Sequence, residues 1–537
     1  MIVTLVAGLG PGFKNSTYLS GSLFDRAAGP ATAAEYFRHT GSHFDLDMLG
    51  FSYRGELYPL LRPRRGSVPH LTTATLESII HSADAGCVVV PTDRIWDGTA
   101  VAPAESELVL LSTTFIWDRR TLGTALDWVR SELPDVPVVL GGQYTNLKWQ
   151  QTLAEHPDLL AIVRGDGELA IPLLLQAIRN GDSLDRVPNL VYREGGEIRL
   201  TRAENIDLND HPSPSFRGRY PVVPYESMRG CPFRCRFCSF PHASPEWRYK
   251  TAEKISGDWR DYAERNGTHF VKAMDSTFTV PPKRLAGLLE LLPAVGVEWE
   301  GYSRANVIKH ERLLDQLAAA HCRFLSIGFE SMSDKVLQAM DKRVTAAQNR
   351  RAFELLRQGP VGYRCSFMTG YPSETPEDFQ ATSDFLVSEY AGHFMLSVFS
   401  LQDEQMPVWQ DAERYSIVLD DAINPDYAWR HCGMDVATAR RLNHRTLDAV
   451  RKHNDDAVLV LWQADYQTWL MPQLSARDNL VVEKTVERIG MLPLDEPDPV
   501  AGAGRLTELL AVLRKYGVEV TDPRYLSAEP LWEIDGR

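Results

Sequence analysis

The chain lacks any run of about 18 apolar residues, the length that a membrane-spanning helix needs, so no membrane partner is expected. It also lacks an excess of basic residues, because 57 Lys and Arg stand against 71 Asp and Glu and the formal net charge is −14. Phosphate binding needs a basic surface, so nucleic acid is not expected as a partner either. The first residues, Met1–Gly10, are apolar without a basic segment, which favours a buried strand in a cytoplasmic protein over a signal peptide.

Cysteine is scarce as well. The 537 residues contain seven cysteines, an odd number without a secretion signal, so a disulfide framework is not expected. A second Cys-x-x-Cys pair, which structural zinc sites usually need, is absent. Four cysteines stand alone, most of them in apolar segments, and are predicted to be small buried hydrophobic residues: Cys87, Cys322, Cys365 and Cys432. The other three lie within one short motif.

Residues 1–205 alternate segments rich in β-branched residues with segments of helical spacing. The strand candidates are Ile2–Ala7, Cys87–Pro91, Leu108–Thr113, Val136–Leu140 and Leu160–Val163. Leu122, Leu126 and Val129 mark a helix between the third and the fourth of these strands. The alternation predicts an α/β fold, a doubly wound, Rossmann-like domain with a parallel sheet.

Glycine and small polar residues follow three of these strands. They are Ser112-Thr113-Thr114, Gly141-Gly142-Gln143 and Gly165-Asp166-Gly167-Glu168. In doubly wound sheets ligands bind outside the carboxyl ends of the strands, and glycine lets a backbone approach a ligand closely. A Gly-Gly pair alone is usually only a turn, so these segments indicate a pocket without specifying its ligand.

A second alternating region runs from residue 206 to residue 400, and it begins with a polar, proline-bearing connector, Asp207–Phe216. Its strand and helix candidates are Phe270–Met274, Phe324–Phe329 and Tyr363–Met368, and Arg284–Leu292, Glu311–Ala319 and Asp334–Met340. Another helix is predicted to begin at Thr375, an N-cap followed by Pro376. These units predict a partial or complete α/β (TIM-like) barrel. Residues 401–537 are expected to form a small, mostly helical domain, with helices near Val436–Lys452 and Gly504–Tyr516.

The clustered cysteines are Cys231, Cys235 and Cys238. Three thiolates within eight residues can hold one [4Fe-4S] cluster, and one iron of that cluster then lacks a protein ligand. A small molecule with an amine and a carboxylate can chelate this open iron. The alternative is a zinc site with His242 as the fourth ligand, which the spacing alone does not exclude.

The run from Cys231 to Cys238, with Phe237 in the aromatic position, resembles the signature of the radical S-adenosylmethionine (SAM) superfamily. Further segments resemble family motifs in order along the chain: Met274-Asp275-Ser276-Thr277-Phe278, Tyr302-Ser303-Arg304-Ala305-Asn306, Ser326-Ile327-Gly328-Phe329-Glu330-Ser331 and Thr369–Thr375. The resemblance implies that residues 206–400 form a radical SAM barrel, in which the open iron binds SAM and cleaves it to a 5′-deoxyadenosyl radical. It also implies contacts to SAM from Phe237, Asp275, Ser276, Arg304 and Glu330. A buried structural ion pair is the alternative for Arg304 and Glu330.

A doubly wound domain before such a barrel resembles the cobalamin-dependent class of this superfamily, of the class B methyltransferase type. The resemblance implies that residues 1–205 bind cobalamin, in the pocket formed by Ser112, Thr113, Thr114, Gly141, Gly142, Gln143, Gly165 and Glu168. The Asp-x-His-x-x-Gly motif that supplies a histidine to cobalt in many cobalamin proteins is absent, so no histidine ligand is expected. The segment Arg62–Arg65 is either close to the cobalt or a solvated loop.

The resemblance implies a methyltransferase that moves a methyl group from SAM, through methylcobalamin, to a carbon of a small-molecule or peptide natural product. Flavodoxin or ferredoxin is the expected electron donor. The alternatives on the same scaffold are a rearrangement, a cyclisation or a polar methyl transfer without a radical. A non-catalytic iron–sulfur or zinc protein that binds a partner is a third hypothesis.

Overall fold

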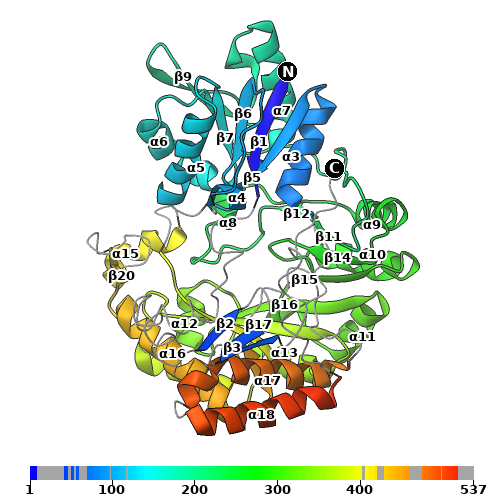
Figure 1. Ribbon diagram of the computed structural model, residues 1–537, viewed down its shortest axis with the longest axis vertical. Helices are drawn as coiled ribbons and strands as arrows, with labels where there is room; N and C mark the ends of the chain where they lie inside the picture. The colour runs from blue at the N-terminus through cyan, green and yellow to red at the C-terminus, as the bar shows by residue number, and fades with distance from the viewer. Residues whose placement is uncertain are drawn as a thin grey trace.

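The computed structural model describes residues 1–8, 42–45, 50–53, 56–59, 69–96, 98–116, 119–401, 406–419, 429–459, 474–496 and 499–517. The predicted segment Arg62–Arg65 lies outside these residues. Two α/β domains of different size lie one above the other, and two long helices cover the far end of the larger domain (Figure 1). No helix among the described residues is long and apolar enough to span a membrane.

The N-terminal sheet has seven strands in the order β10-β9-β8-β7-β6-β1-β5. Their bounds are β1 Ile2–Ala7, β5 Gly86–Pro91, β6 Leu108–Ser112, β7 Val138–Gly141, β8 Ala161–Val163, β9 Leu190–Glu194 and β10 Glu197–Leu200. The pairs from β5 to β8 are parallel, and the sequence predicted these strands. It did not predict the hairpin β9–β10, which adds two antiparallel strands at one edge.

Helices cover both faces of this sheet, as a doubly wound domain requires. The helices α3 (Leu71–Ser82) and α7 (Gly167–Asn180) pack on one face, where Ile80 and Leu174 meet the strands. The helices α5 (Arg119–Glu132) and α6 (Gln143–Glu155) cover the other, with the short helix α4 (Thr92–Trp96) beside α5 (Figure 1). The predicted Rossmann-like architecture is therefore confirmed.

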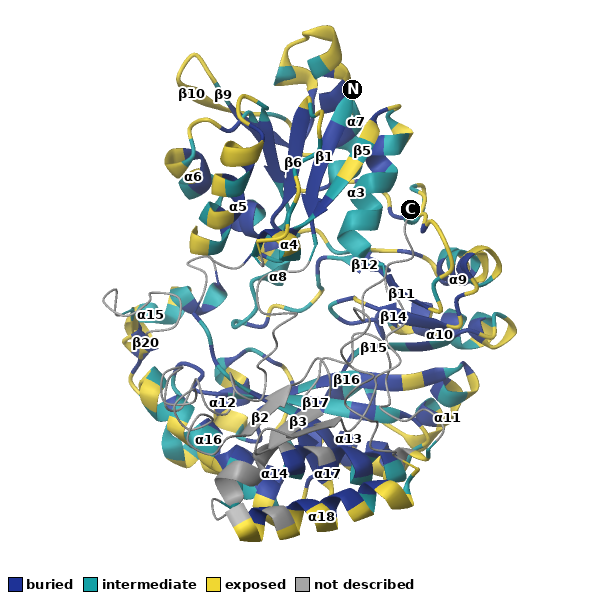
Figure 2. Cartoon of the chain, viewed as in Figure 1, coloured by how far each residue is buried: buried dark blue, intermediate teal, exposed yellow. Residues whose placement is uncertain are grey.

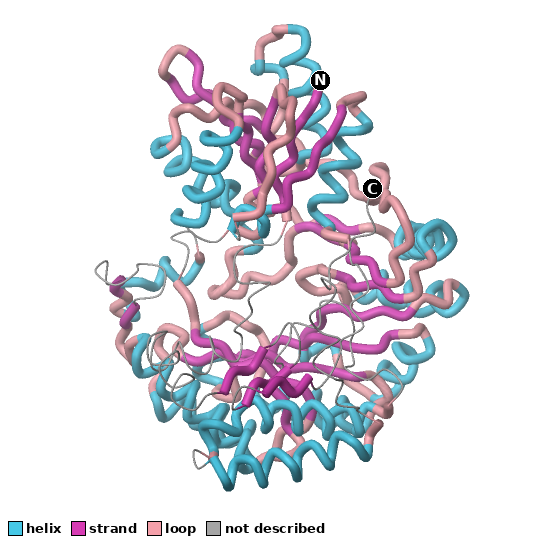
Figure 3. Tube along the Cα trace, in the orientation of Figure 1, coloured by secondary structure: helices cyan, strands magenta, loops and turns pink. Residues whose placement is uncertain are grey.

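The larger sheet also has seven strands, in the order β11-β14-β15-β16-β17-β18-β21, and every neighbouring pair is parallel. Their bounds are β11 Val222–Tyr225, β14 Phe270–Ala273, β15 Glu298–Arg304, β16 Cys322–Glu330, β17 Gly362–Thr369, β18 Gly392–Val398 and β21 Ala457–Leu459. Among the described strands β11 and β21 are the two edges, so the predicted barrel is a partial one (Figure 3). Its last strand comes from the region that was expected to be helical.

Helices line the outside of this barrel: α9 Ala252–Asn266, α10 Pro282–Leu291, α11 Glu311–Ala319, α12 Asp334–Ala339, α13 Ala346–Gln358, α14 Pro376–Ser388 and α16 Val436–His453. The helix α14 begins as predicted, with Thr375 as N-cap and a capping box closed by Asp378. The core lies between helices and strands, so the sheets are buried while the outer helix faces are exposed (Figure 2).

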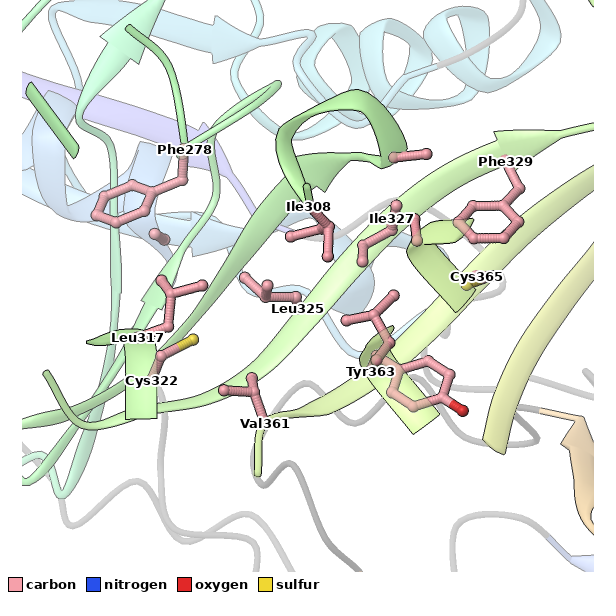
Figure 4. Close-up of a cluster of buried hydrophobic side chains, with 14 of the residues drawn as sticks. Phe278, Ile308, Leu317, Cys322, Leu325, Ile327, Phe329, Val361, Tyr363 and Cys365 are labelled. Carbon is pink, nitrogen blue, oxygen red and sulfur yellow. The ribbon is translucent and has the colours of Figure 1, made fainter. Parts of the chain in front are cut away.

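Two of the four isolated cysteines belong to this core. Cys322 and Cys365 are buried among Leu325, Ile327 and other apolar side chains (Figure 4), as predicted. Cys87 is half-buried at the end of its strand. Cys432 is exposed, so its predicted burial is wrong.

The C-terminal region adds α15 Ala412–Tyr415, β19 Val418–Leu419, β20 Trp429–Arg430, α17 Ala476–Asp495 and α18 Pro499–Lys515. The structure has the predicted helices as α16 and α18, whereas α17 was not predicted. The helix α17 lies against β21 and against β2 (Ser42–Asp45) of a small meander that continues through β3 (Gly50–Tyr53) and β4 (Glu56–Pro59). Its Glu483 pairs with His393 of β18, and both side chains are buried.

Candidate active site

The three motif cysteines lie on one loop at the junction of the two sheets. The loop follows β12 (Met228–Arg229), which pairs with β13 (Arg248–Tyr249), and it precedes the short helix α8 (Phe240–Ala243). Cys235 is buried, and Cys231 and Cys238 are half-buried. The backbone N–H of Arg236, inside the loop, donates to the carbonyl of Met340 at 2.9 Å. The loop is therefore tied to the segment after α12.

The turn before Cys231 requires glycine. Gly230 has a φ of +71°, and a Cβ atom there would lie 2.6 Å from the carbonyl oxygen of Glu246. Its own carbonyl accepts a hydrogen bond of 3.2 Å from the hydroxyl of Ser276. The predicted site residue Ser276 thus lies directly beside the start of the cysteine loop.

Asp275 lies beneath the same loop. One of its carboxylate oxygens accepts from the backbone N–H groups of Ser227 at 2.7 Å and Met228 at 3.0 Å, and the other accepts from the Ser227 hydroxyl. Burial raises the pKa of Asp275 to about 6, although these hydrogen bonds and the nearby Arg284 act in the opposite direction. The carboxylate of this predicted SAM contact is therefore occupied by the backbone that leads into the loop.

Arg304 ends β15 beside the buried cysteine. One guanidinium nitrogen lies 3.5 Å from the sulfur of Cys235, and another donates to the carbonyl of Lys342. The guanidinium also stacks on the ring of Phe233, 3.8 Å from its centroid. The partners of Arg304 thus hold its guanidinium against the cysteine loop, and among the described residues it forms no ion pair.

Glu330 forms the buried ion pair that the sequence left open as the alternative. Its carboxylate lies 2.7 Å from the Nζ of Lys342, and both side chains are buried. Glu330 has a φ of +64° at a break in the pairing of β16 with β17, a strained conformation for a residue with a side chain. A Cβ at Gly328 would collide with this carboxylate. The Lys342 ammonium is 5.4 Å from the ring centroid of Phe237, the aromatic residue of the cysteine motif.

The donor set fits an iron–sulfur cluster. Burial raises the pKa of Cys238 to about 11, so the free thiol holds its proton and binding of iron must displace it. Among the described residues, no three His, Cys, Asp or Glu side chains are grouped as ligands of a single metal ion. His242, the alternative fourth zinc ligand, is exposed on α8.

A cavity of about 290 Å³ opens at the carboxyl ends of β6, β7 and β8. Seven of the predicted pocket residues line it: Ser112, Thr114, Gly141, Gly142, Gln143, Gly165 and Glu168. Thr113 does not. Its hydroxyl donates to the carbonyl of Gly141 at 2.9 Å and lies 3.1 Å from the hydroxyl of Thr145, so it joins two strands to α6.

Backbone atoms form part of the cavity wall at Gly142. This residue has a φ of +113°, and a Cβ there would lie 2.8 Å from the backbone nitrogen of Thr114. Apolar side chains of α3 and α7, among them Leu76 and Ile171, complete the wall on this side. Their contribution was not predicted. The helical spacing of apolar residues in Leu71–Ser82 could have predicted the helix that supplies part of this wall.

The opposite wall of the cavity comes from the cysteine loop region. Phe240 and Ala243 of α8 line it, together with Arg229 and Arg248 of the β12–β13 pair. The side-chain amide of Asn146 on α6 donates to the carbonyl of Ala243 at 3.1 Å and connects the two domains there. The cavity therefore lies between the N-terminal sheet and the residues that flank the cysteines.

A buried ionic network crosses the same junction. Arg229 contacts Asp166 at 2.8 Å, Glu168 at 2.5 Å and Glu226 at 3.0 Å, and Arg248 also pairs with Asp166. Burial opposes the charge of Arg229, but Glu226 and Glu168 outweigh burial and raise the pKa of Arg229 well above its ordinary value. Burial likewise opposes the charge of Glu168, yet Arg229 lowers its pKa. The network thus locks the β8–α7 turn to the strand that leads into the cysteine loop.

Sequence reasoning did not assign Arg229, although it lies two residues before Cys231. It also did not assign Arg248 or Lys342. Arg229 and Arg248 meet Asp166 from 63 and 82 residues away, and Lys342 meets Glu330 from 12 residues away, so these pairings depend on the fold.

Comparison with protein families shows that residues 225–386 match the radical SAM superfamily. An uncharacterized methyltransferase, PH0819 from Pyrococcus horikoshii, is 29% identical over 47% of this chain and 58% of its own length. An anaerobic magnesium-protoporphyrin IX monomethyl ester cyclase from Rubrivivax gelatinosus is 28% identical over 46% of this chain and 48% of its own length. The chain thus spans about half the length of these relatives.

Two solved structures are similar in fold over most of this chain. The radical SAM methyltransferase TsrM from Kitasatospora setae, with cobalamin and a [4Fe-4S] cluster bound, superposes with a TM-score of 0.59 at 16% identity, over 84% of this chain and 97% of its own. The cobalamin-dependent radical enzyme OxsB, with aqua-cobalamin and SAM bound, gives a TM-score of 0.53 at 17% identity, over 92% and 66%. At this identity the likeness shows the fold alone. The chain therefore contains a radical SAM domain at residues 225–386, joined to a doubly wound domain in the fold of the cobalamin-dependent radical SAM enzymes.

Proposed function

We propose that this protein is a cobalamin-dependent radical SAM enzyme that transfers a methyl group from SAM to a carbon of a small-molecule or peptide substrate. Its cofactors are a [4Fe-4S] cluster on Cys231, Cys235 and Cys238, SAM, and cobalamin. When bound, the cluster and SAM supply the radical that removes a hydrogen atom, and the corrinoid carries the methyl group to the substrate. A flavodoxin or ferredoxin is the proposed electron donor.

The observation that carries this proposal is the placement of the cavity. Its lining combines Gly142 and Ser112 from the N-terminal strand ends with Phe240 and Arg229, which flank the cysteine loop. A corrinoid tail in this cavity would bring the rest of that cofactor next to the cluster. Both cofactors are needed in one reaction, so this adjacency favours a single active centre at the domain junction.

The chain's own residues position and charge this centre. Gly142 lines the cavity and lets its turn lie against the backbone of Thr114, where a side chain would collide. Asp275 holds the backbone before the loop, and Arg304 places a positive charge beside Cys235. The buried Glu330–Lys342 pair adds no net charge below the loop, because its two charges cancel. These residues therefore fix the geometry of the loop that carries the three cysteines.

The test is a product analysis of the full chain, loaded anaerobically with iron, sulfide and hydroxocobalamin. The protein is incubated with SAM and titanium(III) citrate, and S-adenosylhomocysteine and 5′-deoxyadenosine are quantified by mass spectrometry. We expect both products, since methyl donation yields the first and reductive cleavage the second. Cys235→Ala should lose iron and 5′-deoxyadenosine. Cys432→Ala, which removes an exposed cysteine outside the motif, should keep both.

A second candidate function is a cyclisation or rearrangement that uses the same cofactors. The likeness to the Rubrivivax gelatinosus cyclase favours it as the alternative. It predicts 5′-deoxyadenosine without S-adenosylhomocysteine above the level of a corrinoid-free control. That result would contradict the methyltransferase proposal while leaving the radical SAM chemistry in place.

A further inference from the structure

On the inner face of the partial barrel, a row of polar side chains crosses neighbouring strands at the same height, which we call a level. The cysteine site does not use these side chains. The strand pairing aligns Tyr302 with Ser326, Ser326 with Arg364, and Arg364 with His393, across β15, β16, β17 and β18. Side chains alternate along a strand, and Cys365 and Phe367 face the helices. Arg364 therefore points to the interior of the barrel.

The other charged side chains on this inner face have partners, including Arg304, which contacts Cys235 and donates to the carbonyl of Lys342. Lys272 lies 3.0 Å from Glu300, Lys342 pairs with Glu330, and His393 pairs with Glu483. Isolated charges inside proteins are costly, so pairing of this kind is the rule. These pairs leave the interior with few cations that are available to a ligand.

Arg364 is the exception among these inner-face cations. It is half-buried, and its Nε donates to the hydroxyl of Ser326 at 2.7 Å. Its guanidinium lies 6.0 Å from the ring centroid of Tyr302. Within the described residues no carboxylate contacts it, and its two terminal nitrogens have no hydrogen-bond partner. A planar pair of N–H donors therefore remains directed into the barrel.

The level above Arg364 leads to the cysteine loop. There the pairing aligns Arg304, which contacts Cys235, with Gly328 and then with Ser366. Two residues along a strand correspond to a rise of roughly 7 Å. Ser366 of β17 and Met395 of β18, which the pairing aligns, lie at this upper level and are only partly buried. The wall at this level is thus mixed in polarity.

We propose that Arg364 binds a carboxylate group of the substrate. This inference deepens the proposed function and rests on it for the identification of the bound molecule as substrate. The guanidinium matches a carboxylate in two parallel hydrogen bonds, with the Tyr302 hydroxyl at the same level as a further donor. A phosphate dianion would call for a second cation, and the inner-face candidates Lys272 and His393 are held by Glu300 and Glu483.

The layer spacing also limits the site of reaction. The reacting carbon must approach the level of the cysteine loop, which lies two strand residues, a backbone rise of roughly 7 Å, beyond Arg364. A carboxylate held by Arg364 is therefore at a different level of the barrel from the reacting carbon. The substrate class is therefore a carboxylic acid that is modified away from its acid end.

The test measures binding without turnover, so it stays independent of the methyl-transfer assay. The cluster-loaded full chain, without reductant, is titrated by calorimetry with 4-phenylbutanoate and with the uncharged 4-phenylbutanamide. We expect the acid to bind at least about tenfold more tightly than the amide, which is the contribution of one charge-assisted pair. Arg364→Gln should abolish this preference, and Arg364→Lys should keep part of it. The matched control is Arg323→Gln on β16, an exposed arginine paired with Glu298.

Each outcome of the titration either supports or overturns the proposed role of Arg364. Equal affinity for acid and amide, or no binding of the acid up to about 20 mM, would overturn the proposal. If inorganic phosphate displaces the acid at a lower concentration than the acid itself needs, the site binds a phosphate group and the carboxylate proposal is wrong. Iron content and melting temperature equal to those of the wild type show that a variant is folded, so a lost preference then reports on Arg364 itself.

Discussion

The replacement of Arg229 by methionine tests how the two domains are joined. Arg229 lies among the carboxylates of Asp166, Glu168 and Glu226, with 16% of its side chain exposed. Methionine keeps an unbranched side chain but removes the charge and the hydrogen bonds. Asp166 retains Arg248 as a partner, whereas Glu168 keeps no other cation that pairs with it among the described residues.

The expected cost follows from the buried charge that remains. Removal of one partner of a buried ion pair typically destabilises a protein by about 3–5 kcal/mol. For a domain of this size each kcal/mol corresponds to roughly 2–4 °C, so the melting temperature should fall by roughly 6–20 °C. The pKa of Glu168 is lowered in the folded state, so its stabilising contribution is present at neutral pH and is lost as the pH falls through the folded pKa. The difference between variant and wild type should therefore shrink in acid.

The assay is thermal unfolding of the anaerobically loaded protein, followed by circular dichroism, with iron and corrinoid content measured on the same samples. The matched control is Arg199→Met, because Arg199 is 52% exposed and pairs with Glu194 and Glu197 on the β9–β10 hairpin. This control should change stability by less than about 0.5 kcal/mol.

The double variant Arg229→Met/Glu168→Met examines the same interaction directly. It should recover part of the lost stability, because no unpaired carboxylate then remains at that position. A loss of less than about 1 kcal/mol in Arg229→Met, or no recovery in the double variant, would refute the argument that this network locks the domains together.

Three further predictions concern the two cofactor sites and the pH dependence of stability. Gly142→Ala should lower the corrinoid content measured by absorption spectroscopy, because its φ is +113° and the new Cβ would lie 2.8 Å from the backbone nitrogen of Thr114; Gly123→Ala, with open space around it, should not. Asp275→Ala should lower the iron content, since the backbone N–H groups of Ser227 and Met228 would lose their shared acceptor; an unchanged content would exclude a role in holding the loop. Burial raises the pKa of Glu374 to about 8, above the unfolded value, so the folded state retains a proton and stability should fall as the pH rises from about 4.5 to about 8, by about 1.4 kcal/mol per unit. The free energy of unfolding, measured by denaturant titration at several pH values in this range, should depend less on pH for Glu374→Gln than for the wild type. An equal pH dependence of the two proteins would contradict the assignment.

Local patterns predicted much of the fold. The segments Ile2–Ala7 and Glu311–Ala319 have the predicted bounds, because each carries a complete periodic signal of its own. The helices α9 and α13 and the hairpin β9–β10 were not predicted. The strand β21 was also missed, since three residues carry no recognisable period and only pairing with β18 makes them a strand.

The candidate site shows the same division. Ser112 and Thr114 line the cavity, while Thr113 between them faces α6, because side chains alternate along an extended chain. The sequence predicted that all three residues line the pocket. It could not predict which of the three side chains face the cavity, because that depends on the orientation of the strand. Asp275 was expected to meet SAM, a contact that stays a prediction, and the structure directs its carboxylate to the backbone of Ser227.

The sequence by itself marked the proposed cluster site, because Cys231, Cys235 and Cys238 lie within eight residues and local spacing is enough to bring three ligands together. Only the tertiary structure decided how Arg229 joins the two domains and how Arg364 stands unpaired on the inner wall of the barrel. Those features depend on strand register and on the approach of segments some 60 residues apart, such as Glu168 and Arg229, and no local pattern encodes either.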